Sequence, residues 1–543
     1  MYSPPDSSFV PKEVSEGYSH AKARASNWRQ QLEDVRELVR PNASEFMGST
    51  GRGKPRSAKI YDSTAPWALE QLASGLHSYM TDPSGRWFML GIQGVPTADI
   101  PFPIAAWLES ATDRLFAEFA NPASRFQQTV KEVYLDFASF GTGIQFENWD
   151  YNKKCVLFRS RPLAKCFIDE GYDGSVNHIY YDEDYKLTEI NRMFPNAALP
   201  DSMLKAGPEA EFTVTHAVCP NEKYFPGYKA NLGKKFSSYF FVESEKGFIL
   251  SQGGFDRLPY QVPRWTTVPG EVYGRGPAMT ALPDIQLLNI MNKELIMAAQ
   301  LANRPPLALD DDSFLLPISY TPGSLIFKTP GTDAPEPILG GGNFNITLEL
   351  MQQKREQIAK TFHVDWLLRG KKKERQSVYE VTDDRQEMLR QIASITGRIE
   401  TDHLSPTIHN TFYLLQREGQ LPPPPPELQG VQLEIVYTSS ASKAQMSAKA
   451  DAISQFMTEM TPLYGVDPSI FDGIELSRLG AEQAILRDIT HKVRSSPEQI
   501  AAKQRQRQQE KQAQTGLANA QQAGTMAGAL KDVATAQEKG LTL

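Results

Sequence analysis

The sequence contains few cysteines, since Cys155, Cys166 and Cys219 are the three found in 543 residues. Their scattered positions provide neither a disulfide framework nor a Cys-x-x-Cys metal pair, which is typical of a protein kept in a reducing compartment. His216 lies three residues before Cys219, but a metal site needs a second pair of ligands at a matching spacing, and the sequence offers none. We therefore predict that the protein binds no metal and no cofactor.

The chain also lacks an excess of positive charge and a long apolar run. Its formal net charge is −7, with 22% charged residues, which excludes a basic protein that coats nucleic acid. The longest apolar stretches, such as residues 295–302, are too short to span a bilayer. The first residues do not form a signal peptide. We expect a protein made and kept in the cytoplasm, or in something assembled there, with no membrane partner.

A complete phosphate-binding loop is missing as well. Gly48, Gly53 and Lys54 match the pattern G-x-x-x-x-G-K-[ST], but Pro55 stands where the pattern requires Ser or Thr. Proline supplies neither a hydroxyl group for Mg²⁺ nor a backbone N–H for phosphate. The segment also follows a helical pattern instead of a strand. We interpret it as a basic surface loop.

The segment 166–170 (CFIDE) superficially resembles the second motif of an ATPase, an apolar strand ending in carboxylates. Its apolar part, Cys166–Ile168, is explained more simply as one strand of a β-hairpin whose second strand is Val176–Tyr181, with a turn-rich loop beginning at Asp169 between them. This interpretation places Asp169 and Glu170 at the solvated tip of the hairpin. Neither motif supports an ATPase. No Ser-His-Asp, Cys-His or paired-carboxylate set can be assembled, and we predict no catalytic residues and no enzyme.

The first 276 residues combine helices with β-strands. Apolar residues from Val14 to Val39 recur at spacings of four and three, which predicts one helix ending at Pro41. Short β-prone runs separated by Gly, Pro, Asn and Asp fill residues 144–265 and predict an antiparallel β region flanked by helices. The fold class is therefore α+β. A chain of this length should contain several domains.

Two long helices are predicted after this region, at Pro283–Asn303 and Ile346–Leu368. At ~1.5 Å per residue they would be roughly 32 and 34 Å long, and so of matched length. A Pro- and Gly-rich insert between them suggests an antiparallel helical hairpin with a small module at its tip. The first helix is apolar on most faces, and one partner helix cannot cover all of them. We assign packing between subunits to Ile285, Leu288, Met291, Leu295 and Ile296.

A cluster of cations follows the second helix. Gly370 and the absence of an apolar stripe predict a loop, and Glu374 is its one anion. The loop could be solvated, pair with acidic groups of a neighbouring subunit, or contact phosphate groups. The cations are Arg369, Lys371, Lys372, Lys373 and Arg375.

The remainder of the chain is mainly helical. A long helix beginning at Thr382 or Asp383 should end before Pro406, and a further helix should reach Arg417. The five prolines at 422–426 predict an extended linker. A strand at 432–438 leads into C-terminal helices, and a polar tail begins at Pro497.

Several of these segments, in the same order, resemble the head-to-tail connector, or portal, proteins of short-tailed, T7-like bacteriophages. The likeness covers most of residues 20–420. It is carried by SNWRQQLEDVRELVRPNASEF, IYDSTAPWALEQLASGLHSYMTDPSGRWF, FGTG, VYGRGPAMTALPDIQLLN and KKKERQSVYEVTDDRQEML.

The resemblance implies a ring of twelve subunits at one vertex of the capsid, with a channel through which double-stranded DNA is packaged and ejected. It also implies a portal fold made of a wing, a two-helix stem, a clip and a crown. The corresponding segments are 1–276 (wing), 277–303 (first stem helix), 304–343 (clip), 344–368 (second stem helix), 369–381 (channel loop), 382–440 (wing helix and return strand) and 441–543 (crown and polar tail).

The resemblance further implies the partners. The five cations of residues 369–375 would contact DNA without regard to its sequence. The clip would bind the terminase motor and later the tail adaptors, and capsid, scaffolding and internal core proteins would contact other parts of the ring in the virion. Two alternatives remain open: the packaging ATPase, which the broken phosphate-binding loop disfavours, and a tail or adaptor protein forming a ring of another size.

Overall fold

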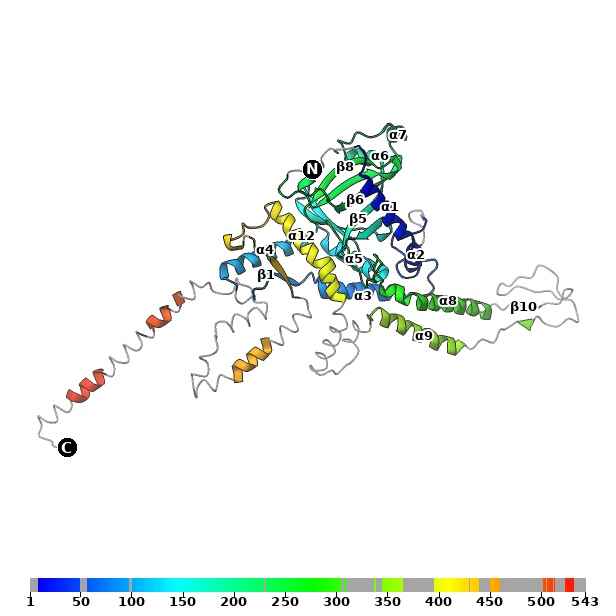
Figure 1. The fold of residues 1–543 in the computed structure, drawn as a ribbon. Helices are drawn as coiled ribbons and strands as arrows, with labels where there is room; N and C mark the ends of the chain where they lie inside the picture. Colours follow the sequence, from blue (N-terminus) through cyan, green and yellow to red (C-terminus); the bar gives the residue numbers. More distant parts are fainter. Residues whose placement is uncertain are drawn as a thin grey trace. The chain divides into compact units, whose positions relative to one another are not determined.

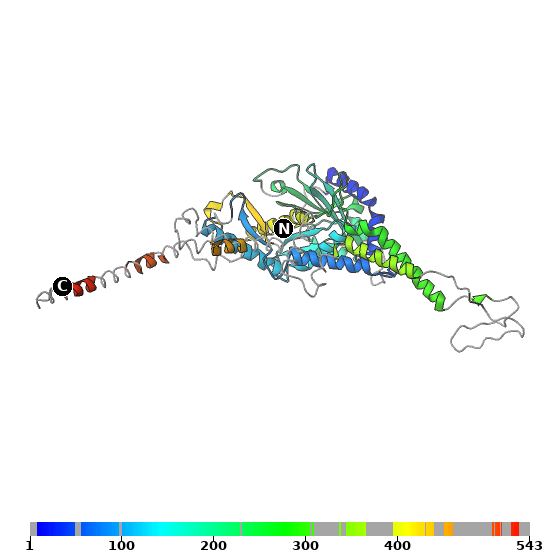
Figure 2. The same ribbon diagram turned by 90° about the horizontal axis from the view of Figure 1, so that it is seen from below.

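The protein is described here by a computed structural model, which covers residues 8–48, 56–96, 100–228, 231–303, 307–308, 336–337, 344–364, 395–428, 430–438, 450–459, 502–503, 505–510, 512 and 523–531. It contains both helices and sheets, in agreement with the predicted α+β class (Figures 1 and 2). The chain divides into unit 1 (Met1–Arg86 and Leu115–Gln420) and unit 2 (Trp87–Arg114 and Leu421–Leu543). Residues 1–276 are therefore not one continuous unit.

The centre of unit 1 is a five-stranded antiparallel sheet with the order β4-β5-β6-β7-β8. The β-prone runs predicted between residues 166 and 255 form its strands, because turn residues separate the runs and keep consecutive strands adjacent, whereas the run that begins at Cys155 belongs to another sheet. The strands are β4 (Cys166–Glu170), β5 (Val176–Lys186), β6 (Glu211–Pro220), β7 (Phe236–Val242) and β8 (Phe248–Phe255). The predicted pairing of β4 with β5 is confirmed.

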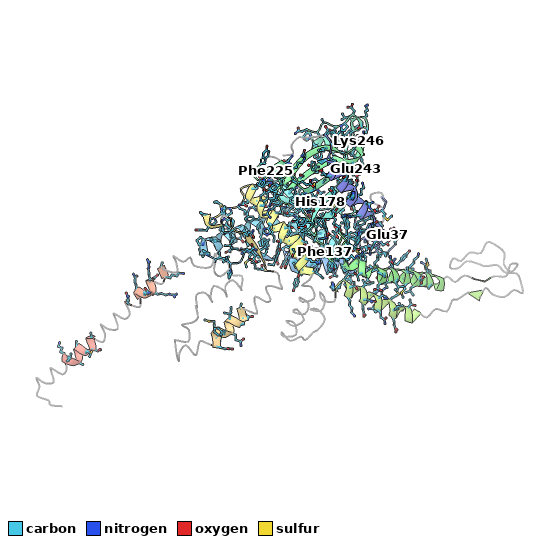
Figure 3. All side chains as sticks on the ribbon, in the orientation of Figure 1. Glu37, Phe137, His178, Phe225, Glu243 and Lys246 are labelled. Atoms are coloured by element: carbon cyan, nitrogen blue, oxygen red, sulfur yellow. The ribbon has the colours of Figure 1, made fainter. Side chains whose placement is uncertain are left out.

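Helices cover both faces of this sheet. Helix α1 (Lys12–Ser26) lies on one face, where Tyr18 packs its ring against Phe241 and donates a hydrogen bond of 2.7 Å to Asp182 Oδ2. Lys22 on the same helix forms an ion pair of 3.0 Å with Glu243, which Figure 3 labels.

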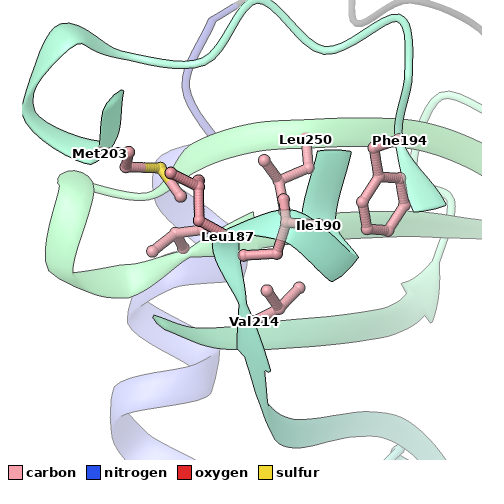
Figure 4. Packing of buried hydrophobic residues seen from close by; sticks show 7 residues of the cluster. Leu187, Ile190, Phe194, Met203, Val214 and Leu250 are labelled. Atoms are coloured by element: carbon pink, nitrogen blue, oxygen red, sulfur yellow. The ribbon is translucent and has the colours of Figure 1, made fainter. Parts of the chain in front are cut away.

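The short helices α6 (Leu187–Met193) and α7 (Asp201–Lys205) pack on the other face of the sheet. There they close an apolar cluster with residues of β6, β7 and β8 (Figure 4). Its members are Leu187, Ile190, Phe194, Met203, Val214, Val242 and Leu250.

The single N-terminal helix expected from the apolar stripe is in fact two helices, α1 and α2 (Arg29–Leu38). The chain leaves the α-helix at Asn27 and Trp28, whose backbone N–H groups bond carbonyls three residues back. The ring of Trp28 packs against Tyr273. The stripe stays in phase across the break, and periodicity alone therefore could not reveal it.

A second sheet and several helices complete the body of unit 1. This sheet has the order β3-β2-β9, formed by β2 (Gln145–Asp150), β3 (Cys155–Ser160) and β9 (Tyr260–Gln261). Helices α3 (Thr64–Met80) and α5 (Phe126–Phe140) contact each other, and α5 also contacts β2 and β3.

Unit 2 is built around a two-stranded antiparallel sheet of β1 (Phe88–Ile92) and β12 (Leu433–Tyr437). The predicted return strand is thus present, and its partner β1 precedes it by more than 300 residues. Helix α4 (Phe102–Ala120) begins in this unit, and its Trp107 Nε1 donates a hydrogen bond of 3.1 Å to the carbonyl of Pro422. Among the described residues, no helix has an apolar stretch long enough to cross a membrane.

Candidate assembly site at helices α8 and α9

Two helices that lie side by side in unit 1, α8 (Pro277–Asn303) and α9 (Phe344–Thr361), correspond to the predicted hairpin (Figures 1 and 2). Helix α8 begins six residues earlier than predicted and continues through Pro283. Helix α9 ends seven residues earlier, because the chain turns at Phe362 and His363, and His363 has a φ of 57°. With 27 and 18 residues, the helices are not of matched length.

The two helices run antiparallel and are fixed to each other near the start of α8. Lys354 Nζ of α9 lies 2.8 Å from Asp284 Oδ1 of α8. On α9, Met351 and Ile358 are buried, with exposed fractions of 1% and 0%. The apolar side chains of α9 are thus only partly covered within the chain, since Leu348 (49%) and Leu350 (40%) remain exposed.

The exposure of α8 changes along its length. In its first half, Ala278, Leu282, Ile285 and Leu288 are buried within the chain itself. From Leu287 onward, large apolar side chains on other faces of the helix are exposed, although a helix in water normally presents polar groups there. They are Leu287 (42%), Ile290 (52%), Ile296 (43%) and Met297 (49%).

The five residues assigned to packing between subunits consequently fall into three groups. Ile285 and Leu288 are buried inside the chain, Met291 and Leu295 are half-buried, and Ile296 is exposed. Residues 287, 290 and 297 share one face of the helix, since spacings of three and seven residues correspond to nearly whole turns.

Side-chain amides of α8 hold the segment that precedes α3. Asn289 accepts a hydrogen bond of 2.7 Å from the backbone N–H of Tyr61 and donates one of 2.9 Å to the carbonyl of Lys59. Asn292 donates to the carbonyl of Tyr61. The side chains of Asn289 and Asn292, one turn apart on α8, thus bond backbone groups of Lys59 and Tyr61 that a neighbouring β-strand could otherwise bond.

Helix α9 binds the next residue of the same segment. Arg355 donates from Nε (3.0 Å) and Nη2 (2.8 Å) to Asp62 Oδ2, and the other oxygen of Asp62 accepts the backbone N–H of Thr64 at 2.9 Å. Asp62 therefore accepts a backbone N–H at the start of α3 while it anchors α9. Burial alone would raise the pKa of Asp62, but the hydrogen bonds from Thr64 and Arg355 outweigh burial and lower it.

Three glycines form the joint between α5 and the start of α8. Gly141 ends α5 with a φ of 71°, a conformation that favours glycine. Cβ atoms added at Gly141, Gly274 or Gly276 would collide with the backbone of the facing segment. The joint is closed by hydrogen bonds from Trp265 N to the Gly141 carbonyl (2.8 Å) and from Gly274 N to Thr142 Oγ1 (2.9 Å). The first turn of α8 therefore has a fixed position on α5.

The helix that precedes the linker also differs from the prediction. Residues 395–399 are α-helical, Glu400–Leu404 form a π-helical turn, and α12 (Ser405–Arg417) continues directly from it. The expected interruption before Pro406 does not occur, because the π turn accommodates a proline that cannot donate a backbone hydrogen bond.

This helix meets the second sheet through polar side chains. Gln145 bonds His403 Nε2 and Thr407 Oγ1, each at 3.0 Å. Glu147 accepts hydrogen bonds from Gln261 (2.8 Å) and Thr411 (3.3 Å). Glu147 is 1% exposed, and its burial raises the pKa of its carboxyl well above the usual value.

The raised pKa of Glu147 makes stability dependent on pH. The native state holds the proton of this carboxyl after the unfolded state has released it, so the free energy of unfolding falls as the pH rises above about 4.5, the unfolded value. We expect Glu147→Gln, which keeps the shape without the titration, to unfold at a higher urea concentration than wild type at about pH 8. The difference should shrink toward pH 5. An equal difference at both pH values would contradict this expectation.

The carboxylates Asp169 and Glu170 are not at a solvated tip. Both belong to β4, where Asp169 pairs with Arg24 and Glu170 pairs with the buried Arg264. Both carboxylates form structural ion pairs, and they therefore do not serve as the carboxylates of an ATPase motif.

His216 is a satisfied core residue. Its ring nitrogens lie 2.7 Å from Tyr260 Oη and 3.0 Å from Ser238 Oγ, and its pKa is lowered by burial to about 3. Neither contact involves Cys219. In the part of the chain that the structure describes, no group of three His, Cys, Asp or Glu residues could hold a metal ion.

Some predicted features lie outside the described residues. These include most of the phosphate-loop look-alike and the whole cationic loop with Arg369, Lys371, Lys372, Lys373 and Arg375. Within 304–343 the structure describes the antiparallel pair β10 (Leu307–Ala308) and β11 (Glu336–Pro337). The anchoring residues Asp62, Asn289, Asn292 and Arg355 were not predicted, because each belongs to an ordinary polar helix face or turn when the sequence is considered alone.

Comparison with known proteins gives a consistent result. The family model described as "Bacteriophage head to tail connecting protein" matches residues 11–491. The chain is 26% identical to a "Probable portal protein" of Bordetella phage BPP-1, over 97% of this chain and 96% of that protein. It is 25% identical to the "Portal protein" of Salmonella phage epsilon15, over 94% and 93%.

Among solved structures, the chain is similar to one titled "Virion of native gene transfer agent (GTA) particle". The similarity covers 82% of this chain and 98% of that chain, with 11% identity and a TM-score of 0.37. This score is too low to support a structural argument.

Proposed function

We propose that this chain, which belongs to the family of bacteriophage head-to-tail connecting proteins, assembles with further copies of itself into a ring whose channel passes double-stranded DNA. As a portal protein, it is a structural component of the virion at the junction of head and tail. We propose that the ring forms in the host cytoplasm and carries DNA inward during packaging and outward during ejection.

The observation that carries the ring is the exposed apolar face of α8. Leu287, Ile290 and Met297 lie on a face of α8 that the described part of the chain leaves exposed. A repeated copy of the same helix pair would cover this face with a surface of similar chemistry. One side of the helix pair in each subunit would contact the other side of the pair in the next subunit. Such head-to-tail contacts close into a ring when the rotation between neighbouring subunits divides a full turn. We propose twelve subunits.

The domain roles follow the predicted segments with one adjustment. We propose that α8 and α9 are the stem, that 304–343 form the clip, and that most of unit 1 is the wing. Residues 87–114 pair with the chain after residue 420, and we therefore group them with the crown side of the molecule.

The proposed contact with DNA is the loop of residues 369–381. Its cations Arg369, Lys371, Lys372, Lys373 and Arg375 would neutralise phosphates without reading bases, so the duplex could slide. A net charge of −7 on the chain would keep the rest of the channel from gripping the DNA. The clip would dock the terminase motor and then tail adaptors, while capsid, scaffolding and internal core proteins would meet the ring from the head side.

Negative-stain electron microscopy of the purified chain tests this proposal. We expect annular particles with about twelve projections and a central opening. A monomer at every concentration examined would contradict ring formation, and a closed ring of a clearly different subunit number would favour a tail adaptor.

A further inference from the structure

Three arginines of unit 1 come together where α5 begins. Arg125 is the residue before α5, and Arg159 lies on β3. The backbone N–H of Phe158 donates a hydrogen bond of 3.0 Å to the carbonyl of Ser124. Arg159 and Arg125, which follow these two residues in the sequence, therefore lie side by side. Arg161 continues on the same face of the chain as Arg159, because alternate residues of an extended strand share a face.

The protein neutralises these arginines only in part, through Asp150 near Arg159 and Glu183 near Arg161. Arg125 and Arg159 are exposed, and neither forms an ion pair with a residue that the structure describes. Arg161 approaches Glu183 at 3.8 Å, beyond hydrogen-bond distance, and Lys165 shares that carboxylate at 3.4 Å. The Nε atom of Arg161 is buried without a hydrogen-bond partner.

Arg161 is held mainly by aromatic rings, beside its long ion pair with Glu183. Its guanidinium lies 4.2 Å from the ring centre of Tyr181 and 5.3 Å from that of Phe146, between the two sheets. Burial, and then the adjacent charge of Arg161, lower the pKa of Arg159. The charge of Arg125 also lowers this pKa, whereas Asp150 raises it. Like charges close together destabilise a fold, so an anionic ligand that binds here would offset the remaining repulsion among the three arginines.

The first turn of α5 adds to the attraction for anions. The helix has 15 residues, and its N-terminal end carries a partial positive charge. Ser124 Oγ accepts from Phe126 N at 3.4 Å, and α5 begins with no acidic residue in its first turn. The site thus combines guanidinium groups with a helix end, which is the chemistry that binds phosphate.

We propose that Arg125, Arg159 and Arg161 bind the phosphodiester backbone of double-stranded DNA at a second site, separate from the loop of residues 369–381. This inference rests on the proposed function only in that it takes DNA as the ligand. A duplex supplies closely spaced phosphates on an extended, solvated surface, so it can meet several exposed guanidinium groups at once without burying apolar side chains. The contact is independent of base sequence.

The test measures binding of a short labelled duplex to the full-length chain by fluorescence anisotropy, between about 50 and 200 mM salt. In the double variant Arg125→Gln/Arg159→Gln we expect the slope of log affinity against log salt to become shallower by about 2, or roughly 0.9 for each lost phosphate contact. Arg125→Lys/Arg159→Lys should restore most of the slope, because the charge is kept.

Arg257→Gln is the matched control. Arg257 is exposed, as Arg125 and Arg159 are, and it lies 5.9 Å from the centre of the Tyr413 ring, much as Arg161 lies over Tyr181. Its substitution should leave the slope unchanged. Equal slopes for wild type and the double variant would overturn the proposal. So would a wild-type chain that binds no duplex, or a double variant that binds DNA normally but assembles poorly, which would indicate a protein carboxylate as the ligand.

A wild-type chain that binds no duplex would also contradict the DNA contact proposed for residues 369–381, whereas the other outcomes are distinct from failure of the proposed function. Ring formation is judged by electron microscopy and does not depend on the arginines. Rings without any change in DNA binding would overturn the second site alone.

Discussion

Replacing Ile290 and Met297 together by aspartate should abolish ring assembly while leaving the subunit folded. Both side chains are about half exposed, at 52% and 49%, so the isolated chain loses little when they become polar. In a ring, each would be buried against the neighbouring subunit, where an apolar side chain contributes about 1.5–3 kcal/mol. A carboxylate there would be desolvated without a partner. The loss recurs at every interface of the ring.

Size-exclusion chromatography with light scattering would measure the effect. We expect wild type at the mass of a ring and the double variant near the 60.7 kDa of one chain, with an unchanged circular dichroism spectrum. Leu204→Asp is the matched control, because Leu204 is 54% exposed on α7 and should tolerate a charge. Rings formed by the double variant at normal yield would show that another surface holds the subunits together.

The sequence predicted the β-sheet of unit 1 well, for a physical reason. Its strands are rich in β-branched and aromatic residues, and segments containing Gly, Pro, Asn or Asp separate them. Each strand therefore pairs with the next along the chain, as β4 pairs with β5 and β6 with β7. Such local order requires no knowledge of distant contacts.

Features that depend on distant residues were missed or wrong. Asp169 and Glu170 were expected in solvent, but their partners Arg24 and Arg264 lie far away in the sequence. The break between α1 and α2 leaves the apolar period intact. No local pattern encodes either feature.

The candidate site shows the same limit. Periodicity identified α8 as apolar on most faces but could not say which face its own chain covers. Ile285 and Leu288 turned out to be buried by unit 1, whereas Leu287, Ile290 and Met297 remain exposed. Sequence gives the amount of apolar surface on a helix, and the fold decides how much of it remains for a partner.

The joint of Gly141, Gly274 and Gly276 at the start of α8 should tolerate no side chain. We expect Gly274→Ala to lower the free energy of unfolding by about 3 kcal/mol. A Cβ at this position would overlap the carbonyl oxygen of Gly141 and lie 3.0 Å from the Cβ of Arg264. The overlap is with backbone, which cannot rotate aside as a side chain can. Either α8 shifts away from α5 or the hydrogen bond from Gly274 N to Thr142 is lost.

Gly397→Ala provides the comparison within the same unit, since a Cβ there meets nothing within 4 Å and residues 395–399 are helical. In a helix, alanine is favoured over glycine by about 1 kcal/mol. Urea unfolding at one protein concentration should therefore move the midpoint down for Gly274→Ala and slightly up for Gly397→Ala. Equal midpoints would mean that the joint yields, and that the contact of α8 with α5 does not fix the position of the helix pair on unit 1.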